Sequence, residues 1–570
     1  MVSEEILSAI RKYAIKNAIE YGKANDKSVL GKILSQFPDA KSDMRQLNSE
    51  IAKIVAEVNS MGKADLEAGF SQHKEEFSEA QKKKAEESVP KFVLEGAVAG
   101  QFATRFPPEP GGYMHIGHAK VSFMEREFAD IYKGTLALFF DDTNPEKESQ
   151  EFVDQFKEDL KWLGIKFDRE YYSSDHMEQL YGYAEHLIRD KHAYVCMCSG
   201  DTIKQNRTES ISCEHRAAIP NKNLELWKKM VSGGFEENGA VLRLRGDLKS
   251  LNTVMRDPVL FRIKRQPHYR QGTKYSAWPT YDFNTPIIDS LEGITDAMRS
   301  KEYELRDELY YRLLDLLELR KPRVHSVARL EIKDNITSKR ETTRLIKEGF
   351  LMGYDDPRLI TIASLRRRGI VPEAIKKFVM RFGMSKVNSI VDISMLIDEN
   401  RRIVDKTAKH LFFVEEPVRL KVEGMDSFEA KMRFGSENPS EYRSYKVGNN
   451  FYIGKKDSIG LKNGDRIRLK DLFNVEVSNS KGDIIAKHIG DQGNHSKVVQ
   501  WVSEGNCSPA KLLIPGRLLI DGEFNKDSLT KADGLVEDAA KSLREGEIVQ
   551  LERVGFFRLD NKDEMLFIGS

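Results

Sequence analysis

The fold of this chain is most clearly indicated by residues Thr104–Lys120, which read TRFPPEPGGYMHIGHAK. Apolar and polar residues alternate over Gln101–Phe106, which predicts a short strand, and the prolines of Pro107–Gly112 prevent regular structure after it. A helix is expected to begin near His115. Because the first N–H groups of a helix are unpaired and its dipole attracts anions, this strand, loop and helix start predict a phosphate-binding site.

Two histidines strengthen this interpretation. His115 and His118 are three residues apart and therefore share one face of the expected helix, where their imidazoles add donors for phosphate oxygens. Gly117 between them leaves space for a flat ligand close to the backbone. A histidine pair at this spacing arises mostly by chance, but the residues around it add specificity. The segments RFPPEP and GYMHIGHAK resemble the first signature of the class I aminoacyl-tRNA synthetases, in their glutamyl and glutaminyl branch.

Length and composition limit the class of protein. With 570 residues, 40% hydrophobic and 31% charged, the chain is expected to form about three to five domains of a globular protein. Lys and Arg total 90 against 89 Asp and Glu, so net charge neither supports nor excludes nucleic-acid binding. The sequence has no run of about 18 apolar residues and no signal-like start, and its four cysteines give no disulfide framework. A cytoplasmic location without membrane insertion is expected.

The resemblance implies a multidomain fold. Helical spacing of Ile6, Ile10 and Ala14 favours an α-helical start, and from about residue 418 short alternating runs separated by turns such as Asn463-Gly464 are typical of β-barrels. The expected parts are a helical N-terminal extension (1–93), a class I Rossmann-type α/β catalytic domain in two halves (94–194 and 276–344), an inserted acceptor-binding domain with a zinc site (195–275), a helical stem-contact region (345–417) and C-terminal all-β anticodon-binding barrels (418–570).

A second apolar strand leads to a pair of carboxylates. Leu136–Phe140 is apolar throughout, as strands covered on both faces are, and ligands bind at the carboxyl ends of such strands, where Asp141 and Asp142 follow. A capped turn is the alternative reading of these residues. The resemblance implies that Asp141 and Asp142, with Glu109, contact the tRNA end. Phe139 stands where the family usually has Arg.

The second class I signature is present in degenerate form. Arg323–Ile332 predicts a strand and Lys333–Arg340 its loop, in which Thr337 replaces the usual Met of the family. By resemblance, Ser338 and Lys339 of this loop join His115 and His118 as catalytic residues. The resemblance also implies that four residues bind ATP: Pro107, Gly117, Arg329 and Leu330.

Three residues predict the amino-acid substrate. The resemblance places Arg105, Tyr281 and Arg299 in the amino-acid pocket, and Arg299 stands where glutaminyl enzymes have a small uncharged residue. A guanidinium favours a side-chain carboxylate, and glutamine would leave its charge unpaired, so glutamate is predicted. The alternative is that Arg299 pairs only with an acid of the protein itself.

Basic and metal-ligating residues complete the candidate sites. Arg366, Arg367 and Arg368 are consecutive and resemble the stem-contact region, where they are expected to contact tRNA phosphates, although a solvated helix face would give the same run. Three of the four cysteines and a histidine lie close together in the sequence, which is the donor set and number that structural Zn²⁺ takes. The expected ligands are Cys196, Cys198, Cys213 and His215.

The resemblance therefore implies ATP-dependent activation of L-glutamate and its transfer to the 3′ adenosine of tRNA(Glu). Charging of tRNA(Gln) is left open. The expected ligands are ATP, L-glutamate, Mg²⁺ and structural Zn²⁺, activation is expected to require tRNA, and a monomer is expected. The alternatives are a glutaminyl enzyme, which Arg299 disfavours, and a non-enzymatic tRNA-binding relative, which intact His115, His118, Ser338 and Lys339 disfavour.

Overall fold

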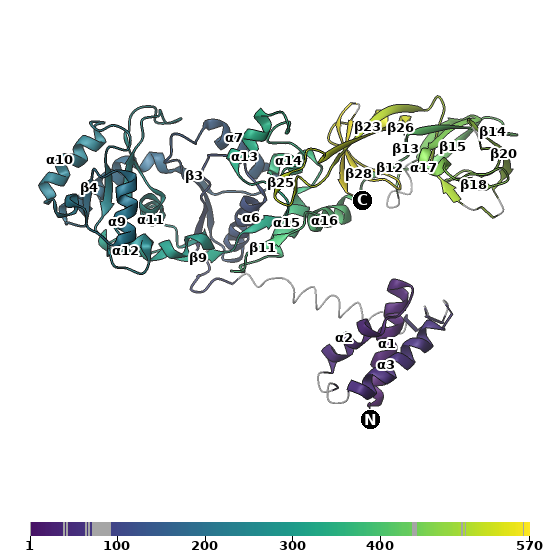
Figure 1. The fold of residues 1–570 in the computed structure, drawn as a ribbon, viewed down its shortest axis with the longest axis horizontal. Coiled ribbons are helices and arrows are strands. Elements are labelled where there is room, and N and C mark those ends of the chain that lie inside the picture. The colour runs from purple at the N-terminus through teal and green to yellow at the C-terminus, as the bar shows by residue number, and fades with distance from the viewer. Residues whose placement is uncertain are drawn as a thin grey trace. The chain divides into compact units, whose positions relative to one another are not determined.

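The computed structural model describes residues 2–37, 40, 44–62, 65–66, 69–70, 93–435, 442–480, 482–491, 494–495, 497–562 and 564–569. The chain divides into two compact units, Met1–Lys91 and Phe92–Ser570, which are coloured along the sequence in Figure 1. Each unit has its own hydrophobic core, so each is described by itself. Among the described residues, no helix has the length and apolar character needed to cross a bilayer.

The first unit is helical, as the periodicity of its sequence predicts. It contains α1 (Glu4–Tyr21), α2 (Asp26–Gln36) and α3 (Met44–Asn59). The Ser3 side chain accepts a hydrogen bond from the N–H of Ile6 at the start of α1, and Gly22 ends that helix in the left-handed conformation. Ile10 and Ile51 are almost fully buried between the helices. Burial of these apolar faces stabilises the three helices against one another.

The second unit begins with the predicted parallel sheet. Strands β1 (Ala103–Phe106), β2 (Thr135–Phe140) and β3 (Arg169–Tyr172) pair in parallel in the order β1-β2-β3. The connecting helices are α6 (Ile116–Ile131) and α7 (Gln150–Trp162). Helix α6 packs between this sheet and α15 (Pro372–Met380), as Figure 1 shows. The predicted α/β architecture is confirmed, and the helix start near His115 is confirmed by α6.

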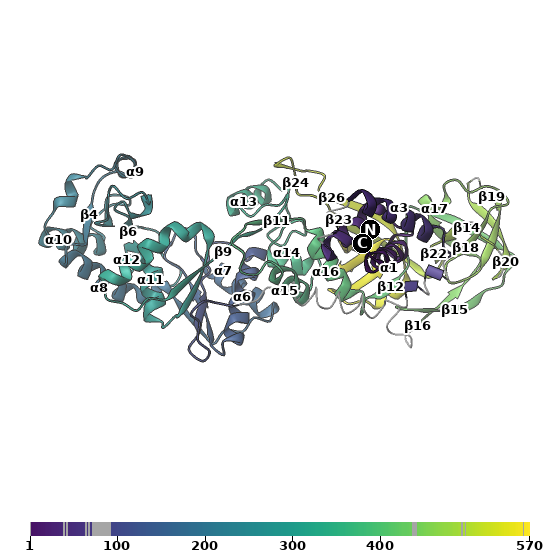
Figure 2. The same cartoon turned by 90° about the horizontal axis from the view of Figure 1, so that it is seen from below.

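A four-stranded antiparallel sheet separates the two halves of the α/β region. Its order is β4 (Ala193–Cys196), β5 (Val241–Leu244), β6 (Val259–Ile263) and β7 (Ala277–Pro279). Helices α8 (Met177–Arg189) and α10 (Pro220–Val231) pack against β4, and α9 (Gly200–Glu209) follows it (Figure 2). Because β7 leads directly into α11 (Tyr281–Leu291), this sheet fixes the start of the helix that carries Tyr281.

The α/β region resumes with a parallel pair, β8 (Asp296–Ser300) and β9 (Arg323–Val327), joined through α12 (Asp307–Leu316). The strand predicted over Arg323–Ile332 is interrupted, because Ala328 and Arg329 separate β9 from β10 (Leu330–Ile332). The loop predicted over Lys333–Arg340 is also shorter than expected. It ends at Ser338, where α13 (Lys339–Lys347) begins.

Three helices and a short strand follow α13. Helices α14 (Ile362–Arg367), α15 and α16 (Ser394–Val404) follow α13, and β11 (Ser389–Val391) pairs in parallel with β10. The interpretation of residues 345–417 as helical is wrong at its end, because β12 (Lys409–Leu411) and β13 (Phe413–Glu415) belong to the β-rich region that follows.

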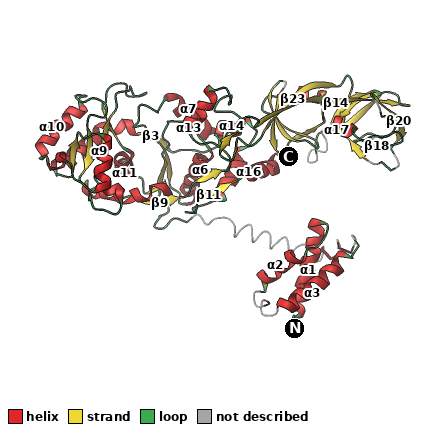
Figure 3. Cartoon of the chain, in the orientation of Figure 1, coloured by secondary structure: helices red, strands yellow, loops and turns green. Residues whose placement is uncertain are grey.

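The C-terminal region is built from two seven-stranded sheets, and strands dominate this part of the chain in Figure 3. The first sheet combines β12 and β13 with β23 (Cys507–Pro515), β26 (Leu529–Glu537), β27 (Ile548–Leu551), β28 (Gly555–Asn561) and β29 (Glu564–Gly569). The second contains β14 (Pro417–Glu423), β17 (Asn450–Gly454), β18 (Arg466–Leu469), β19 (Asn474–Asn479), β20 (Ile484–Gly490), β21 (Lys497–Val499) and β22 (Trp501–Ser503).

The second sheet is therefore inserted into the first between β13 and β23. Two strand pairs form separate two-stranded sheets: β15 (Phe428–Arg433) with β16 (Tyr442–Val447), and β24 (Leu519–Ile520) with β25 (Glu523–Phe524). The predicted β-rich C-terminus is confirmed. The two sheets do not follow one another along the chain, because the chain returns to the first sheet after it completes the second.

Candidate active site

Two adjoining cavities lie at the carboxyl end of the parallel sheet. The smaller has a volume of about 470 Å³ and the larger about 910 Å³, and both are lined by His115, His118 and Thr337. All four residues predicted to bind ATP line the smaller cavity: Pro107, Gly117, Arg329 and Leu330. Tyr281 and Arg299 line it too, whereas Glu109, Ser338 and Lys339 line the larger one. The fold thus brings residues from both halves of the α/β region to one place.

The two histidines cap helix α6. His115 is the N-cap residue, and its Nδ1 accepts a hydrogen bond from the N–H of Gly117 at 3.1 Å. The Nδ1 of His118 accepts from the N–H of His115 at 3.3 Å, and the two rings stack with centroids 3.9 Å apart. Since each Nδ1 is an acceptor, each neutral ring carries its proton on Nε2. Both imidazoles are therefore held as Nε2–H donors.

Burial keeps these rings uncharged. Burial, with a smaller contribution from Arg329, lowers the pKa of His115 from 6.5 to about 4. Burial and the adjacent His115 lower the pKa of His118 well below its ordinary value. Near neutral pH the site therefore offers neutral donors in place of two imidazolium ions.

This pKa shift predicts a pH dependence of stability. The unfolded chain, with an ordinary histidine pKa near 6.5, binds more protons than the folded chain until the pH falls to about 4. Stability should therefore decrease as the pH falls through this window and should not depend on His115 above it. We expect the melting temperature to drop less between pH 7 and pH 5 in His115→Asn, which retains a capping side chain, than in the unaltered protein. Parallel melting profiles of the two proteins would contradict this expectation.

Gly117 is required by the histidine itself. A Cβ atom at this position would lie 2.9 Å from Cε1 and 3.0 Å from Nδ1 of His115. Such a contact is too close, so a side chain would displace the imidazole that caps the helix. The predicted need for space at Gly117 is therefore explained by the His115 ring as well as by room for a ligand.

Lys339 is the first residue of α13. Ser338 caps this helix by accepting a hydrogen bond from the N–H of Glu341, and the Nζ of Lys339 lies 3.3 Å from the carbonyl oxygen of Lys147 and 4.3 Å from the centre of the Phe152 ring. Burial lowers the pKa of Lys339. The ammonium group thus reaches across the larger cavity from the second signature toward the segment that follows β2.

The loop before α13 is supported by the C-terminal β region. The N–H of Leu519 in β24 donates to the carbonyl oxygen of Asp334 at 3.1 Å. Leu518, which is 1% exposed, packs in one apolar cluster with Ile336 and Leu345. A hairpin that is distant in sequence therefore fixes both ends of the segment that carries Ser338 and Lys339.

Arg299 lines the smaller cavity. Its Nε donates to the hydroxyl of Tyr281 at 3.1 Å, and its Nη1 donates to Asp307 at 2.9 Å. The Arg299 side chain is 2% exposed. The alternative that Arg299 pairs with an acid of the protein is therefore realised, while the residue also lines the cavity as the substrate interpretation requires.

Arg105 is not at the cavity surface. Its guanidinium is fully buried, with a bidentate pair to Asp289 at 2.7 and 3.1 Å and a third bond from Nη1 to the carbonyl oxygen of Met298 at 2.9 Å. Burial by itself lowers the pKa of Arg105, but the charge and hydrogen bonds of Asp289, together with Glu125 and Tyr281, outweigh it and raise the pKa. Arg105 thus supports β8, the strand that contains Arg299, through its bond to Met298. A direct contact between Arg105 and the substrate stays a prediction.

Asp141 and Asp142 are buried at the end of β2. Asp141 accepts a hydrogen bond from Asn284 at 2.7 Å, and Asp142 accepts two from Ser174 at 2.8 Å and one from Tyr269 at 3.0 Å. Burial raises the pKa of Asp141 to about 6 and that of Asp142 to about 7. These contacts hold the end of β2 against α11, the turn after β3 and the loop between β6 and β7. The tRNA contacts of both residues stay a prediction.

The three consecutive arginines differ in environment. Arg366 is 33% exposed and pairs with Glu158 at 2.8 Å. Arg367 pairs with Asp560 of β28 at 2.7 Å, and Arg368 is 8% exposed and donates to the carbonyl oxygen of Ile568. Arg367 and Arg368 therefore attach α14 to the C-terminal sheet. Of the three, Arg366 has the most exposed guanidinium for a phosphate contact.

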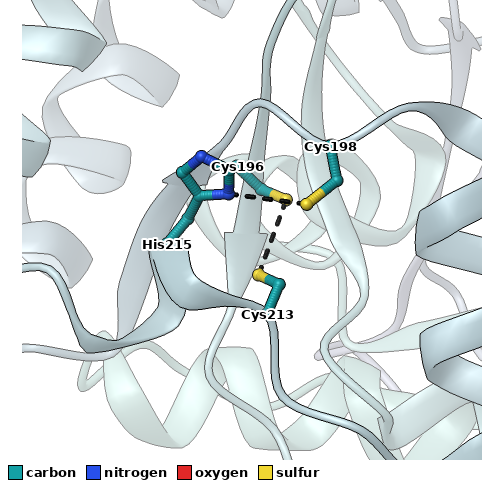
Figure 4. A group of neighbouring side chains, drawn as sticks. All are labelled: Cys196, Cys198, Cys213 and His215. Atoms are coloured by element: carbon teal, nitrogen blue, oxygen red, sulfur yellow. Dashed lines mark hydrogen bonds between the residues drawn. The ribbon is translucent and has the colours of Figure 1, made fainter.

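The predicted metal ligands converge on one point (Figure 4). The candidate ligand atoms of Cys196, Cys198, Cys213 and His215 all lie within 4.8 Å of one another. The sulfurs of Cys196 and Cys213 are 3.8 Å apart, and the Cys198 sulfur is 3.5 Å from Nδ1 of His215. Tetrahedral Zn²⁺ bonds of about 2.3 Å to sulfur and 2.0–2.1 Å to nitrogen give separations of about 3.8 and about 3.5 Å. The cluster thus fits a Cys/His metal site.

A neighbouring charge agrees with this fit. Arg243 is 2% exposed, and its Nη1 lies 3.9 Å from the Cys196 sulfur. Within the described part of the chain no carboxylate pairs with it, and its one close polar contact is with the carbonyl oxygen of Asp257 at 3.0 Å. A buried cation normally has an anionic partner. Metal-bound thiolates would supply that negative charge.

Sequence reasoning missed several residues of the cavities. Lys120 is 2% exposed and donates to the carbonyl oxygen of Ala328 at 2.9 Å, and burial lowers its pKa to about 8. It follows Gly117 by three residues, so helical spacing from the first signature could have found it. Tyr303 lines the smaller cavity, Asp307 pairs with Arg299, and Glu302 pairs with Arg329. No local sequence pattern identifies Tyr303, Asp307 or Glu302, because the fold of the segment between β8 and β9 brings them to the site.

Family models match most of the chain. The model of the catalytic domain of class I tRNA synthetases (E and Q) matches residues 101–407, and models of the anticodon-binding domain of the same enzymes match residues 408–490 and 498–560. The second model begins at residue 408, one residue before the start of β12.

Relatives match over their full length. A glutamate–tRNA ligase of Nitrosopumilus maritimus is 41% identical over 99% of this chain and 100% of its own. The enzyme of that name from Cenarchaeum symbiosum is 37% identical over 99% of both chains, and that from Pyrococcus furiosus is 38% identical over 98% of this chain and 97% of its own.

Proposed function

Since the chain belongs to the class I tRNA synthetases of the glutamate and glutamine branch, we propose that it activates L-glutamate with ATP and transfers it to tRNA(Glu). It is an aminoacyl-tRNA synthetase, and glutamate–tRNA ligases are its full-length relatives. Arg299 is the observation that carries the choice of amino acid, because it places a buried guanidinium in the cavity that contains the predicted ATP residues. A side-chain carboxylate is the partner that this group favours.

The first step forms the mixed anhydride. An oxygen of the glutamate α-carboxylate attacks the α-phosphorus of ATP, and the bond from that phosphorus to the pyrophosphate oxygen breaks. Such a reaction is accelerated mainly by positioning and by stabilising the charge that moves onto pyrophosphate. The Nε2–H groups of His115 and His118 and the ammonium of Lys339 are the donors available for this charge. When bound with ATP, Mg²⁺ would supply further charge neutralisation, and the Glu109 carboxylate in the larger cavity is a ligand suited to it.

The second step transfers the amino acid. A ribose hydroxyl of the tRNA 3′ adenosine attacks the acyl carbon of glutamyl-adenylate, and AMP leaves with the electrons of the broken C–O bond. The smaller cavity is lined by the predicted ATP residues and by Arg299, and it shares His115 and His118 with the larger cavity, through which the tRNA end would reach the activated amino acid. Family models for anticodon-binding domains over residues 408–490 and 498–560 support tRNA as the partner.

Zn²⁺ is the metal that the four-residue cluster favours, with a structural role because all four ligands come from protein. We expect about one zinc per chain by elemental analysis, and removal with a chelator should lower the melting temperature of the inserted sheet. Cys198→Ser should abolish stoichiometric zinc. Cys507→Ser is the matched control, because Cys507 lies in β23 away from the cluster, and it should keep the metal. Equal zinc content in the two variants would argue against this site.

The decisive assay is charging by the purified full chain with labelled glutamate and, separately, labelled glutamine, each on tRNA(Glu) and tRNA(Gln). Glutamate on tRNA(Glu) is expected. Glutamate on both tRNAs would extend the substrate range to tRNA(Gln), and glutamine charging would overturn the role given to Arg299. If tRNA is bound but neither amino acid is charged, the protein is a non-enzymatic tRNA-binding relative and the proposal fails.

A further inference from the structure

The Arg299 guanidinium is held from two sides by residues of the protein. Tyr281, the first residue of α11, accepts from Nε at 3.1 Å, and Asp307, the first residue of α12, accepts from Nη1 at 2.9 Å. The Arg299 side chain is 2% exposed and that of Asp307 is 28% exposed. Arg299 lines the smaller cavity, whereas Asp307 lines neither cavity.

Aromatic rings restrict the guanidinium further. Its central carbon lies 5.3 Å from the centre of the Tyr281 ring, 5.5 Å from that of Tyr303 and 5.2 Å from that of Tyr310. Within the described chain, Nη2 is the one nitrogen of the group without a hydrogen-bond partner. A substrate carboxylate would therefore meet a guanidinium whose other nitrogens are already fixed.

An unrestrained arginine would have to be ordered when the ligand binds. Immobilising a long side chain reduces the binding energy, and preorganised groups avoid that cost. Asp307 also begins a helix, where the dipole favours a negative charge, so its own position is fixed by the backbone of α12. Of the two groups that hold Arg299, Asp307 is the only one that is charged.

We propose that Asp307 is a positioning residue for amino-acid specificity, which fixes Arg299 through Nη1 so that Nη2 remains for the side-chain carboxylate of the substrate. This inference rests on the proposed function, since it assumes that Arg299 receives glutamate. It assigns a role in recognition to a residue that lines neither cavity. The selectivity of the pocket then depends on a carboxylate of the protein as well as on the arginine.

The test separates the hydrogen bond from the charge. Asp307→Ala removes both, and the KM for glutamate should rise about 10-fold or more, with a much smaller change in kcat and in the KM for ATP. Asp307→Asn keeps an oxygen that can accept from Nη1, so its KM for glutamate should stay within about 3-fold of the unaltered protein. The ratio of kcat/KM for glutamate over glutamine should fall in Asp307→Ala and be largely restored in Asp307→Asn. A purely structural role would not move this ratio.

Glu304→Ala is the matched control. It removes a carboxylate from the 3₁₀ turn directly before α12, but that carboxylate pairs with Lys386 and does not line either cavity. Its glutamate KM should not change. If Asp307→Ala leaves the glutamate KM unchanged, or lowers it because Asp307 competes with the substrate for Arg299, the inference is overturned. If the unaltered protein does not charge glutamate at all, it is the proposed function that fails, which distinguishes the two outcomes.

Discussion

Lys339→Ala is expected to lower the rate of glutamate activation by about 10²- to 10³-fold, which is the usual cost of removing one preorganised donor to a developing charge. The Nζ of Lys339 lies at the larger cavity, and its contacts are a carbonyl oxygen of Lys147 and the Phe152 ring. No carboxylate of the described chain forms an ion pair with this ammonium, so its charge remains for the phosphates. A close ion pair between Lys339 and a carboxylate of the protein would have argued against such a role.

The loss should appear mainly in kcat. Lys339 sits where a loop becomes a helix, so it can approach the phosphates most closely as charge develops. The measurement is ATP–pyrophosphate exchange with tRNA present, analysed for kcat and for the KM of ATP separately. Lys333→Ala removes an equal charge from the same loop, but its side chain lines neither cavity, and activity should be unchanged. Equal losses in both variants would mean that general positive charge, and not Lys339, assists the reaction.

Arg299→Gln is expected to reduce kcat/KM for glutamate by about 10²- to 10⁴-fold, because removing one partner of a buried charge pair costs about 3–5 kcal/mol. The guanidinium is 2% exposed, so water cannot replace it effectively. The effect should appear largely in the KM for glutamate, since the α-carboxylate and the phosphates react elsewhere in the cavities. Steady-state charging at varied glutamate concentration measures it.

Arg323→Gln provides the comparison for this second variant. Arg323 pairs with Asp296 at 2.7 Å in the same two-stranded parallel sheet, is 41% exposed and lines neither cavity. It should retain the glutamate KM, although it removes an arginine–carboxylate pair of the same kind. If Arg299→Gln and Arg323→Gln behave alike, Arg299 is a structural residue of the sheet, and the identification of glutamate loses its physical basis.

The sequence predicted those features that depend on the residues of a single short segment. The alternation before Pro107 predicts β1, and the spacing of His115 and His118 predicts the start of α6, which the structure confirms. The grouping of Cys196, Cys198, Cys213 and His215 predicts a cluster whose atoms converge. Each of these signals is local, because strand alternation, helix capping and ligand number depend on neighbours within a few tens of residues.

Signals at the ends of elements were less reliable. The strand predicted over Arg323–Ile332 breaks at Ala328, whose carbonyl oxygen accepts from the Lys120 ammonium. The first two strands of the C-terminal sheet fell inside a region interpreted as helical, since three-residue strands such as β12 and β13 have no period to detect. Pairing with β27 and β26 makes them strands, and those partners lie more than 100 residues away in the sequence.

The amino-acid sequence by itself determined the family signatures and the grouping of three cysteines and a histidine, from which contacts with ATP, tRNA and metal are predicted. Only the tertiary structure decided how those residues are used. In the folded protein Arg105 is buried and pairs with Asp289, and Arg299 pairs with Asp307. Arg367 and Arg368 contact the C-terminal sheet. The physical reason is that ion pairs form between residues that are far apart in the sequence, and that burial in the folded protein sets the pKa of each group. Neither can be deduced from the spacing of residues along the chain.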